Sequence, residues 1–408
     1  MDDWKTVTLA DISIGGKGSY GIPASAVPYS EGSYTYLRIT DINDDGTLNL
    51  SDRKSLDDPA AQEYLLQPND IVFARTGNST GRNYFYDLDD GELVYAGFLI
   101  KFSIDPAKVN PKYIKYYMLS PKYRAWITAF NTGSTRGNIN AQTYANMQID
   151  ILPRKQQDLL VDVLSSLDAK IRVNNQINRN LEEQAKAIFK SWFVDFEPFG
   201  GKQPDDWKDG TIADLGKVIG GGTPSKAKEE YYCQNGIPWI TPKDLSVNKS
   251  KFISRGQTDI SDAGLNNSSA IVMPKGTVLF SSRAPIGYIA IAKNDVTTNQ
   301  GFKSVVPHPH IGTPFVYLFL KHNLEKIESV ASGSTFKEVS GGVMKSIPAL
   351  IPDNKSLSEF TEQCQALFQK QEALEEENNI LQETRDTLLP KLISGEIAQQ
   401  NKTLNHTI

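Results

Sequence analysis

Arginine side chains follow short hydrophobic runs at two matched places in this sequence. Arg75 follows the run 70–74 and precedes the turn 76–82, and Arg283 follows the run 277–282 and precedes a second Gly-containing turn. A guanidinium group at the end of a strand points into a loop, where its planar donors match the O6 and N7 atoms of guanine or a phosphate group. Both residues are therefore candidates for DNA contact, and the alternative for each is a salt bridge inside its own domain.

Other cationic residues lie in loops with the same potential chemistry. Arg136 and Lys337 come just after two Gly-Ser-Thr loops, whose backbone N–H groups and hydroxyls are also suited to phosphate. Lys17 and Lys226 lie in two glycine-rich loops, although an exposed lysine is often only a solvated surface residue. The complete set of candidate DNA-binding residues is Arg75, Arg82, Arg136, Lys17, Arg283, Lys337, Lys226 and Lys243.

Motifs for catalysis, by contrast, are incomplete. A DNA amino-methyltransferase needs an Asn/Asp-Pro-Pro-aromatic loop for the flipped base, and the nearest sequences, at 58–60 and 110–112, lack the second proline. The glycines 220–222 are not followed by the Gly-Lys-Ser/Thr of a phosphate-binding loop. His308 and His310 have no evident third metal ligand. We therefore expect no catalytic residues, no metal site and no cofactor in this chain.

Composition indicates a globular protein of two or more domains. The 408 residues are 39% hydrophobic and 22% charged, and the net charge is −5, which neither requires nor excludes local basic surfaces. The sequence contains no apolar run of membrane-spanning length, and its first residues have neither the basic patch nor the apolar core expected of a signal peptide. Cys233 and Cys364 are too far apart in sequence to suggest a disulfide framework. These features predict a cytoplasmic protein without a membrane partner.

The sequence repeats itself, and this repeat determines where the candidate residues lie. Segments of the first half return in the same order in the second half, with a nearly constant offset. Each copy begins with short β-rich runs, continues with a helical stretch, and ends in a strand-like run before Pro153 or Pro352. The matched segments are 3–5 and 206–208, 9–12 and 212–215, 15–19 and 220–225, 36–42 and 239–245, 70–75 and 276–283, and 133–135 and 333–335.

A heptad pattern follows each proline. It predicts a long helix that pairs with another helix, and an amphipathic helix packed on its own domain is the alternative. Since the chain carries two such helices, we expect them to pair antiparallel, with Asn174 near Gln371 and with Pro390 and Gly395 ending the second helix. The seam residues are Leu160, Leu164, Leu167, Ile171, Asn174, Asn178, Leu181, Ala185, Ile188 and Trp192, and then Phe360, Cys364, Leu367, Gln371, Leu374, Asn378, Leu381, Arg385, Leu388 and Leu392.

Three segments resemble type I restriction-modification specificity subunits. Residues 187–198 (AIFKSWFVDFEP) look like the central conserved region of that family, and residues 388–397 (LLPKLISGEI) look like the end of its second conserved region. Residues 221–226 with 237–245 resemble the opening of its target recognition domains. The resemblance extends over the whole chain in order, but the first copy lacks the Thr-Pro step of that opening.

The resemblance implies an α+β fold with two pseudo-symmetric β-rich target recognition domains, separated by two long antiparallel coiled-coil-like helices. The expected boundaries are 1–153 for the first recognition domain, 154–200 for the first helical region and linker, 201–352 for the second recognition domain, and 353–408 for the second helical region and tail. Each domain would read one half of an asymmetric site in double-stranded DNA, and the helices would set the distance between the halves.

The resemblance also implies partners. Two methyltransferase (modification) subunits, which carry S-adenosylmethionine and methylate adenine N6, would dock on the helical part, and restriction subunits would join them. The expected docking residues are Phe189, Trp192, Phe193, Leu389 and Leu392. Packing of the helix ends against the adjoining domain is the alternative role for Trp192 and Phe193. A coiled-coil scaffold whose duplicated domains bind proteins or peptides is the alternative for the whole chain.

Overall fold

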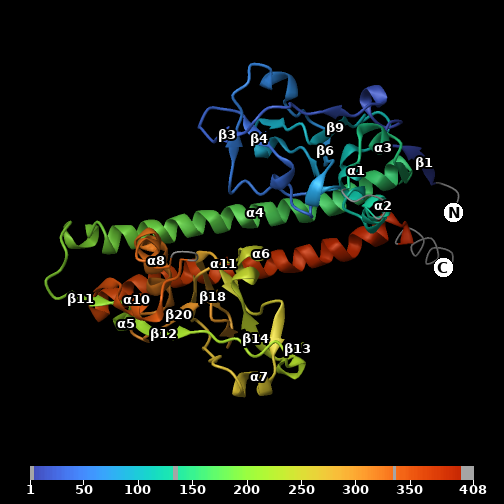
Figure 1. The fold of residues 1–408 in the computed structure, drawn as a ribbon. Coiled ribbons are helices and arrows are strands. Elements are labelled where there is room, and N and C mark those ends of the chain that lie inside the picture. The colour runs from blue at the N-terminus through green and yellow to red at the C-terminus, as the bar shows by residue number, and fades with distance from the viewer. Residues whose placement is uncertain (1–3, 132–136, 334–336, 397–408) are drawn as a thin grey trace, which may run out of the picture. The chain divides into compact units, whose positions relative to one another are not determined.

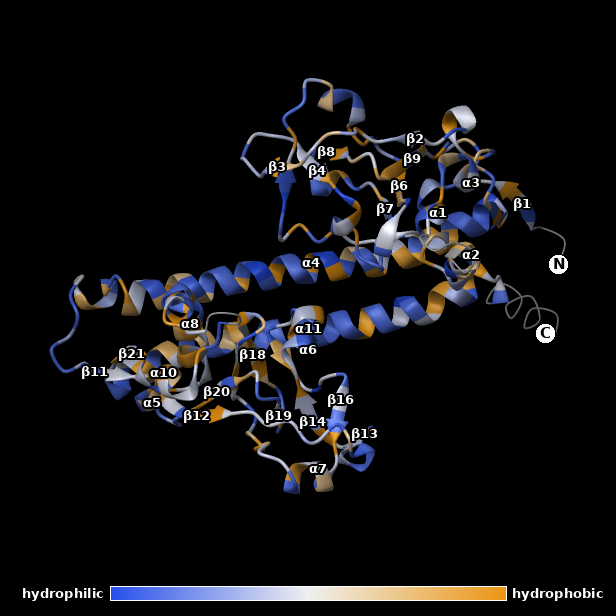
Figure 2. Cartoon of the chain, viewed as in Figure 1, coloured by the Kyte–Doolittle hydropathy of each residue, from blue (hydrophilic) through white to orange (hydrophobic). Residues whose placement is uncertain are grey.

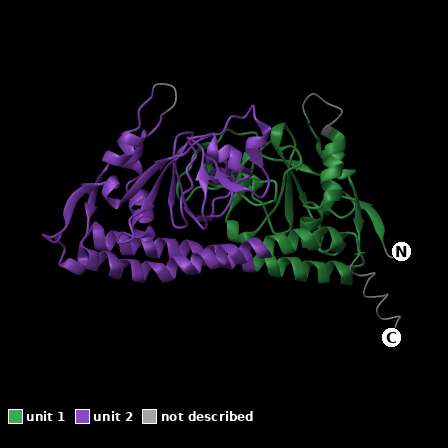
Figure 3. Ribbon diagram, turned by 90° about the horizontal axis from the view of Figure 1, so that it is seen from below, with its two compact units in different colours: residues 1–169, 381–408 green, residues 170–380 purple. Residues whose placement is uncertain are grey.

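The computed structural model describes residues 4–131, 137–333 and 337–396 (Figure 1). The chain divides into two compact units, residues 1–169 with 381–408 and residues 170–380, which Figure 3 draws in different colours. Each unit contains one β-rich domain and segments of two 40-residue helices, α4 (Arg154–Phe193) and α11 (Asn354–Ile393). The predicted α+β fold with two β-rich domains and two long helices is confirmed.

The first unit is built around strand β6 (Asp70–Ala74), in which every residue is buried. Its residues Ile71 to Ala74 form a continuous apolar run, which is typical of a strand that is covered on both faces. The strands form the orders β2-β9-β6-β7 and β3-β5-β4-β8. The other elements are β1 (Lys5–Thr8), β2 (Ser19–Tyr20), β3 (Val27–Pro28), β4 (Thr35–Leu37), β5 (Lys54–Ser55), β7 (Asn83–Phe85), β8 (Leu93–Tyr95), β9 (Leu99–Ser103), β10 (Gln148–Ile151), α1 (Pro111–Tyr117), α2 (Pro121–Asn131) and α3 (Ala141–Ala145).

The second unit repeats this plan around strand β17 (Val278–Ser282), which is also buried throughout. Its sheets have the orders β12-β20-β17-β18-β15 and β13-β16-β14-β19. The strands are β11 (Lys208–Thr211), β12 (Gly216–Gly220), β13 (Tyr232–Cys233), β14 (Ile237–Ile240), β15 (Phe252–Ile253), β16 (Thr258–Ile260), β18 (Ile286–Ala292), β19 (Thr297–Thr298), β20 (Lys303–Pro307) and β21 (Pro348–Ile351). The short helices are α5 (Ile212–Leu215), α6 (Pro242–Val247), α7 (Asp262–Asn266), α8 (Thr313–His322), α9 (Leu324–Ser329) and α10 (Gly341–Ser346).

A two-stranded antiparallel sheet closes each domain just before its long helix. Strand β1 pairs with β10, with Lys5 opposite Ile151, and strand β11 pairs with β21, with Lys208 opposite Ile351. The first and last strands of each domain are thus hydrogen-bonded together. Because β10 and β21 directly precede α4 and α11, this pairing fixes where each long helix begins relative to its domain.

The long helices contribute apolar side chains to the core of each unit. Figure 2 shows hydrophobic residues recurring along both helices. In the first unit, Leu160 and Leu164 of α4 join Leu389 of α11 in the main core cluster. In the second unit, Phe189 of α4 joins Phe360 of α11. Both alternatives from the heptad pattern therefore apply, because each helix packs on the other helix and on a domain.

The helices are antiparallel within each unit, but their register differs from the prediction by one heptad. Asn174 Nδ2 donates to Asn378 Oδ1 at 3.0 Å, and Gln371 Nε2 donates to the backbone oxygen of Asn178 at 3.2 Å. In the first unit, Arg385 reaches Asp168 at 3.2 Å in the same register. The expected proximity of Asn174 to Gln371 is wrong. Asn174 instead pairs with Asn378, whose amide also donates to Asn175 Oδ1 at 2.8 Å.

Pro390 lies inside α11 and does not end it. The helix continues to Ile393, and Gly395 follows with a φ of 73°. An internal proline loses one backbone hydrogen bond, at a cost of about 3 kcal/mol. Leu389 and Ile393 are both buried in the core of the first unit, and their packing opposes that cost. Of the two residues predicted to end the helix, only Gly395 lies at its end.

Candidate nucleic-acid interface

Arg75 lies directly after strand β6 and carries no ion pair to a described carboxylate. Its Nε donates to Asn138 Oδ1 at 3.4 Å, and its guanidinium group lies 5.0 Å from the ring centre of Tyr20. Its backbone N–H donates to Phe98 O, and its backbone oxygen accepts from Ile139 N–H. Contacts with an amide and a ring leave the positive charge unneutralised. This environment suits an arginine that contacts an external anion or base.

Arg283 is not the backbone counterpart of Arg75. In the second unit, Ser282 donates its N–H to Gly301 and accepts from Val339, which are the hydrogen bonds that Arg75 makes in the first unit. A register irregularity between Phe280 and Ser282 accompanies this change. Arg283 therefore stands one residue further along the chain. The sequence match of the two arginines is off by one position.

The guanidinium groups of Arg75 and Arg283 nevertheless contact residues at equivalent positions of the two domains, Asn138 and Glu338. Arg283 Nη1 lies 3.5 Å from Glu338 Oε2, and Glu338 precedes Val339 as Asn138 precedes Ile139. Lys303 Nζ lies 3.1 Å from the other carboxylate oxygen of Glu338, so two cations share one anion. The net positive charge of this group is consistent with an anionic partner.

Arg82 has a different environment, which favours the salt-bridge alternative. Its Nε lies 2.7 Å from Asp44 Oδ1, its Nη2 donates to Asp44 Oδ2, and its Nη1 donates to the backbone oxygen of Ile42. The fork of donors is thus occupied within the domain. No sequence signal indicated this pairing, because Asp44 lies 38 residues away.

The remaining cations lie at the surface, with one outside the described residues. Lys17, Lys226, Lys243 and Lys337 are all exposed. Arg136 falls in the range that the structure does not describe. Exposure keeps the four lysines available to a ligand, and their DNA contact stays a prediction.

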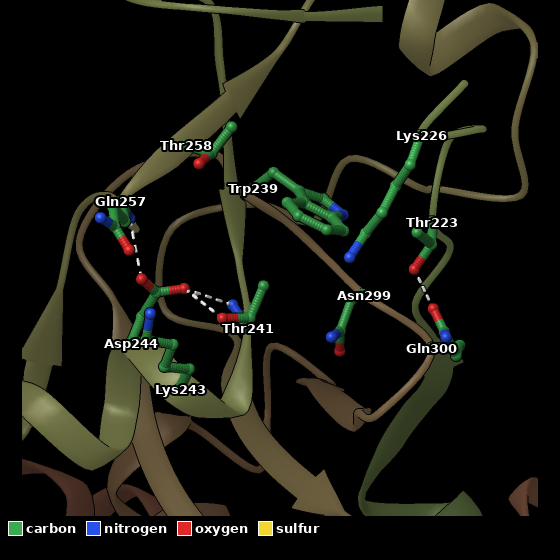
Figure 4. Close-up of a pocket in the computed structure, with 10 residues that line it drawn as sticks. All are labelled: Thr223, Lys226, Trp239, Thr241, Lys243, Asp244, Gln257, Thr258, Asn299 and Gln300. Atoms are coloured by element: carbon green, nitrogen blue, oxygen red, sulfur yellow. Dashed lines mark hydrogen bonds between the residues drawn. The ribbon is translucent and has the colours of Figure 1, made fainter. Parts of the chain in front are cut away.

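Lys226 and Lys243 line a pocket of about 340 Å³ in the second unit (Figure 4). Trp239, at the centre of β14, forms one wall, and its indole N–H donates to Gly222 O at 2.9 Å. Asn299, Gln300, Gln257 and Thr258 add polar groups to the same space. Asn and Gln side chains can contact base edges. The sequence did not indicate these residues, because positions 257 and 299 come together only in the folded domain.

Asp244 lines this pocket and holds two of its segments together through hydrogen bonds. Its carboxylate accepts from the backbone N–H and the hydroxyl of Thr241 and from the backbone N–H of Gln257, all within 2.8 Å. The first domain has the same feature, where Asp41 accepts from the backbone N–H of Arg38 at 2.8 Å. This acidic residue therefore caps a helical turn in both copies.

A buried ionic group joins the second domain to both long helices. Lys251 Nζ lies 2.9 Å from Glu182 on α4 and donates to Gln371 on α11 at 2.8 Å. The Lys251 ammonium group also lies over the ring of Phe368, and the Lys251 backbone N–H donates to Glu375. Burial lowers the pKa of Lys251 to about 8, against the opposite effect of the Glu182 carboxylate.

A similar ionic group joins the first domain to its helix segments. Asp168 on α4 accepts from Lys115 and from the Tyr116 hydroxyl, both on α1, and from Arg385 on α11. Burial opposes ionisation of Asp168, but the positive charges and the hydroxyl hold the pKa of this carboxyl below its ordinary value. Each β-rich domain is thus attached to the helix segments of its own unit by a charged contact.

The expected docking residues lie mainly in the chain's own cores. Phe189 and Phe193 are buried among Phe315, Phe360 and Trp207, and Leu389 is buried in the first unit. Trp192 and Leu392 are partly exposed at the edges of these cores. The packing alternative is therefore favoured for the buried residues. Their contact with a partner is untested.

Grooves nevertheless open beside these cores. In the second unit, a groove of about 420 Å³ is bounded by Phe189, Phe193 and Val194 at the end of α4. In the first unit, a groove of about 400 Å³ is bounded by Leu389 and Pro390 near the end of α11. Both are sites where a partner could reach the helix ends.

Within the described ranges, no cluster of three or more His, Cys, Asp or Glu side chains is arranged to hold a metal ion. His308 and His310 stack on each other, with ring centres 5.8 Å apart. None of the described helices combines the length and apolarity that a membrane crossing requires.

Comparisons with known proteins agree on one family. The model of the type I restriction modification DNA specificity domain matches this chain twice, over residues 1–183 and 204–383. The type I restriction enzyme HindI specificity subunit of Haemophilus influenzae is 25% identical over 97% of this chain and 100% of its own length. The MjaIX specificity subunit of Methanocaldococcus jannaschii is 42% identical over 164 residues, which are 40% of this chain and 38% of that protein.

A solved structure shows the same fold. The type I restriction-modification system S subunit from M. genitalium aligns over 96% of both chains, with a TM-score of 0.58 and 18% sequence identity. The two matches of the family model coincide with the two copies of the internal repeat.

Proposed function

This chain belongs to the family of type I restriction-modification specificity subunits, and on that premise we propose that it reads an asymmetric DNA site in two halves, one with each β-rich domain. Membership makes it the DNA-recognition component of such a system and not a catalytic one. One observation carries the proposal. The chain contains the specificity domain twice, and the two copies differ in the side chains that surround their recognition loops.

Different loop chemistry in the two copies favours different half-sites. The first domain presents Arg75 beside Asn138, whereas the second presents Arg283 and Lys303 around Glu338. Phosphate contacts position a protein on DNA, and contacts with base edges select the sequence. Two domains with unlike donors therefore select unlike sequences, and the resulting site is asymmetric.

As a specificity subunit, the chain works in a complex with DNA and the other subunits of a type I system. We propose that two methyltransferase subunits dock on it, one on each of its two units, and that restriction subunits join that complex. The grooves beside Phe189 and Leu389 support one docking position in each unit. S-adenosylmethionine would be bound by the methyltransferases, and this chain would need no cofactor of its own.

Methylome sequencing tests the reading of a split site. The chain is expressed together with the methyltransferase of its system in cells that lack other adenine methylation. We expect one bipartite motif with a fixed spacer and one methylated adenine in each half. The methyltransferase expressed alone is the control and should leave no such motif. A single continuous motif, or the same motif without this chain, contradicts the proposal.

A charge placed in the groove tests docking. Val194 is 37% exposed and lines the groove at the end of α4. Val194→Asp should reduce the amount of methyltransferase that co-purifies with the chain, because an unpaired charge is costly in an apolar contact. Val247→Asp is the matched control, since Val247 is 78% exposed and lies outside the groove. Equal co-purification of both variants would remove this groove from the docking surface.

A further inference from the structure

We propose that the Trp239 pocket of the second domain recognises a guanine base in the major groove through hydrogen-bond donors supplied by Asn299, Gln300 and the two neighbouring lysines. The inference rests on the proposed reading of DNA and specifies what one domain reads. The pocket of about 340 Å³ lies entirely within the second unit, and Figure 4 shows its polar side chains around a common space.

Asn299 has a fixed orientation that presents a donor. Its Oδ1 accepts the backbone N–H of Gly301 at 2.9 Å. Rotation of the amide by half a turn would place its NH₂ group against that N–H, so the assignment of oxygen and nitrogen follows from the backbone. The Nδ2 group is left for the pocket.

Gln300 and the lysines add donors to the same space. Gln300 contacts the Thr223 hydroxyl through its side-chain amide, and when its carbonyl oxygen accepts from that hydroxyl its NH₂ group can donate into the pocket. Lys226 extends its ammonium group into the space between Trp239 and Asn299 (Figure 4), and Lys243 contributes a second one at the rim. An ammonium group can only donate.

The carboxylate in the pocket is largely occupied by hydrogen bonds within its own domain. Asp244 Oδ2 accepts from the backbone N–H and the hydroxyl of Thr241, and Oδ1 accepts from the backbone N–H of Gln257, so three of about four acceptor sites serve the helical turn. The Gln257 and Gln300 amides can present either a donor or an acceptor, whereas Asn299 is fixed by the Gly301 N–H. The groups that can only donate into the pocket are therefore the Asn299 amide nitrogen and the two lysine ammonium groups.

This polarity selects among the four bases. In the major groove, guanine presents two acceptors, adenine one acceptor and one donor, thymine one acceptor and a methyl group, and cytosine a donor. A pocket with several fixed donors satisfies both guanine acceptors and rejects the cytosine amino group. A backbone phosphate also accepts only, so the test must separate a base from a phosphate.

The first domain lacks this donor set. The strand pairing that places Trp239 beside Thr297 places Tyr36 beside Val94 in the first domain. Two residues further along, Asn299 corresponds to Ala96, and three residues further along, Gln300 corresponds to Gly97. The guanine contact is thus specific to the second half-site, and a change at Asn299 should leave the first half-site unaffected.

Analogue DNA provides the first test. The chain in complex with its methyltransferase binds a duplex that carries its methylated motif, and each guanine is replaced in turn by 7-deazaguanine, which lacks only the N7 acceptor. We expect one guanine of the second half-site to lose about tenfold in affinity, in the range of a single base contact. No loss at any guanine of that half, or a half-site without guanine, overturns the proposal.

An Asn299→Asp variant provides the second test. Aspartate keeps the acceptor for Gly301 and replaces the donor by an acceptor, so the loop can keep its conformation. We expect methylome sequencing to show lost preference for guanine at one position of the second half only, and the 7-deazaguanine penalty should disappear. Asn266→Asp, on the exposed helix α7 of the same domain, adds the same charge outside the pocket and should change neither readout.

The outcomes separate three cases. A uniform loss of affinity on all duplexes, with a smaller salt dependence, would assign Asn299 to a phosphate and overturn the guanine contact. An unchanged motif in the Asn299→Asp variant would also overturn it. A wild-type complex without any sequence-specific motif would instead contradict the proposed function, whatever the pocket contains.

Discussion

At the scale of single residues, the environment of an arginine decides what it can do. Arg75 and Arg82 lie seven positions apart in one loop region and look equivalent in sequence. Arg82 is bound by both oxygens of Asp44, whereas Arg75 contacts only an amide and an aromatic ring. A guanidinium group already paired with a carboxylate has few donors left for DNA. Arg75 is therefore the stronger candidate for recognition.

This difference predicts unequal effects of two substitutions. Arg75→Ala should weaken binding to the specific duplex by roughly 1–3 kcal/mol if Arg75 contacts a base. Arg82→Ala is the matched control and should leave DNA affinity nearly unchanged. Because Asp44 is 80% exposed, its loss of a partner should cost only about 0–1 kcal/mol of stability. Fluorescence anisotropy on specific and random duplexes measures both effects.

Two results would contradict this assignment. An equal loss on specific and random duplexes would make Arg75 a phosphate contact. A larger loss of affinity for Arg82→Ala than for Arg75→Ala would mean that the Asp44 pair opens when DNA binds.

At the scale of elements, charged contacts attach each β-rich domain to the long helices. In the second unit, the loop before β15 supplies Lys251, which contacts Glu182 on α4 and Gln371 on α11. In the first unit, α1 supplies Lys115 and Tyr116 to Asp168 on α4. Removing one partner of a buried ion pair leaves an uncompensated charge. These contacts therefore fix where each recognition surface lies on its helices.

The lowered pKa of Lys251 predicts how stability depends on pH. Burial lowers this pKa to about 8 from an ordinary value of 10.5, so the folded protein releases a proton that the unfolded chain still binds between those values. Stability rises with pH wherever the unfolded state binds more protons. The free energy of unfolding of the wild type, minus that of Lys251→Met, should rise between pH 8 and 10.5 by up to about 1.4 kcal/mol per pH unit.

Urea unfolding of both proteins across this pH range provides the measurement. Lys249→Met is the control, because Lys249 is exposed and lies two residues away. Its difference from the wild type should not vary with pH. A flat difference for Lys251→Met as well would mean that Lys251 stays protonated throughout the range.

At the scale of the whole chain, the duplication gives each unit a domain and a segment of each helix. Helix α4 contributes residues 154–169 to the first unit and 170–193 to the second, and α11 is divided in the same way near residue 380. Both units therefore share two continuous helices. If each domain reads one half-site, the length of these helices sets the number of base pairs between the halves.

An insertion in both helices tests this relation. Seven residues added after Ala169 in α4 and seven after Ile380 in α11 preserve the heptad seam and lengthen each helix by about 10 Å. At about 3.4 Å per base pair, the spacer of the methylated motif should grow by roughly three base pairs. A control that replaces seven surface residues without a change in length should keep the original spacer. An unchanged spacer in the insertion variant would contradict the helical ruler.

Much of the architecture was predictable from sequence because it depends on local and periodic signals. The matched segments showed two copies, and the heptads from Leu160 to Trp192 and from Phe360 to Leu392 showed two pairing helices. The helix-end segments 187–198 and 388–397 indicated the family that the comparisons support. Hydrophobic period and chain order are properties of the sequence itself.

The tertiary structure decided what depends on contacts between distant residues. The contact with Asp44 determines whether the Arg82 guanidinium group is available to DNA. The pairing of Asn174 with Asn378 shows a helix register one heptad away from the predicted one. The Trp239 pocket exists because β14 and β19 pair, which brings Asn299 beside a strand some 60 positions earlier in the chain. Hydrogen-bond partners and charge neutralisation arise only between groups that folding brings within a few ångströms. The sequence alone therefore determined a duplicated DNA-recognition subunit, and the fold determined which of its side chains are available to read a base.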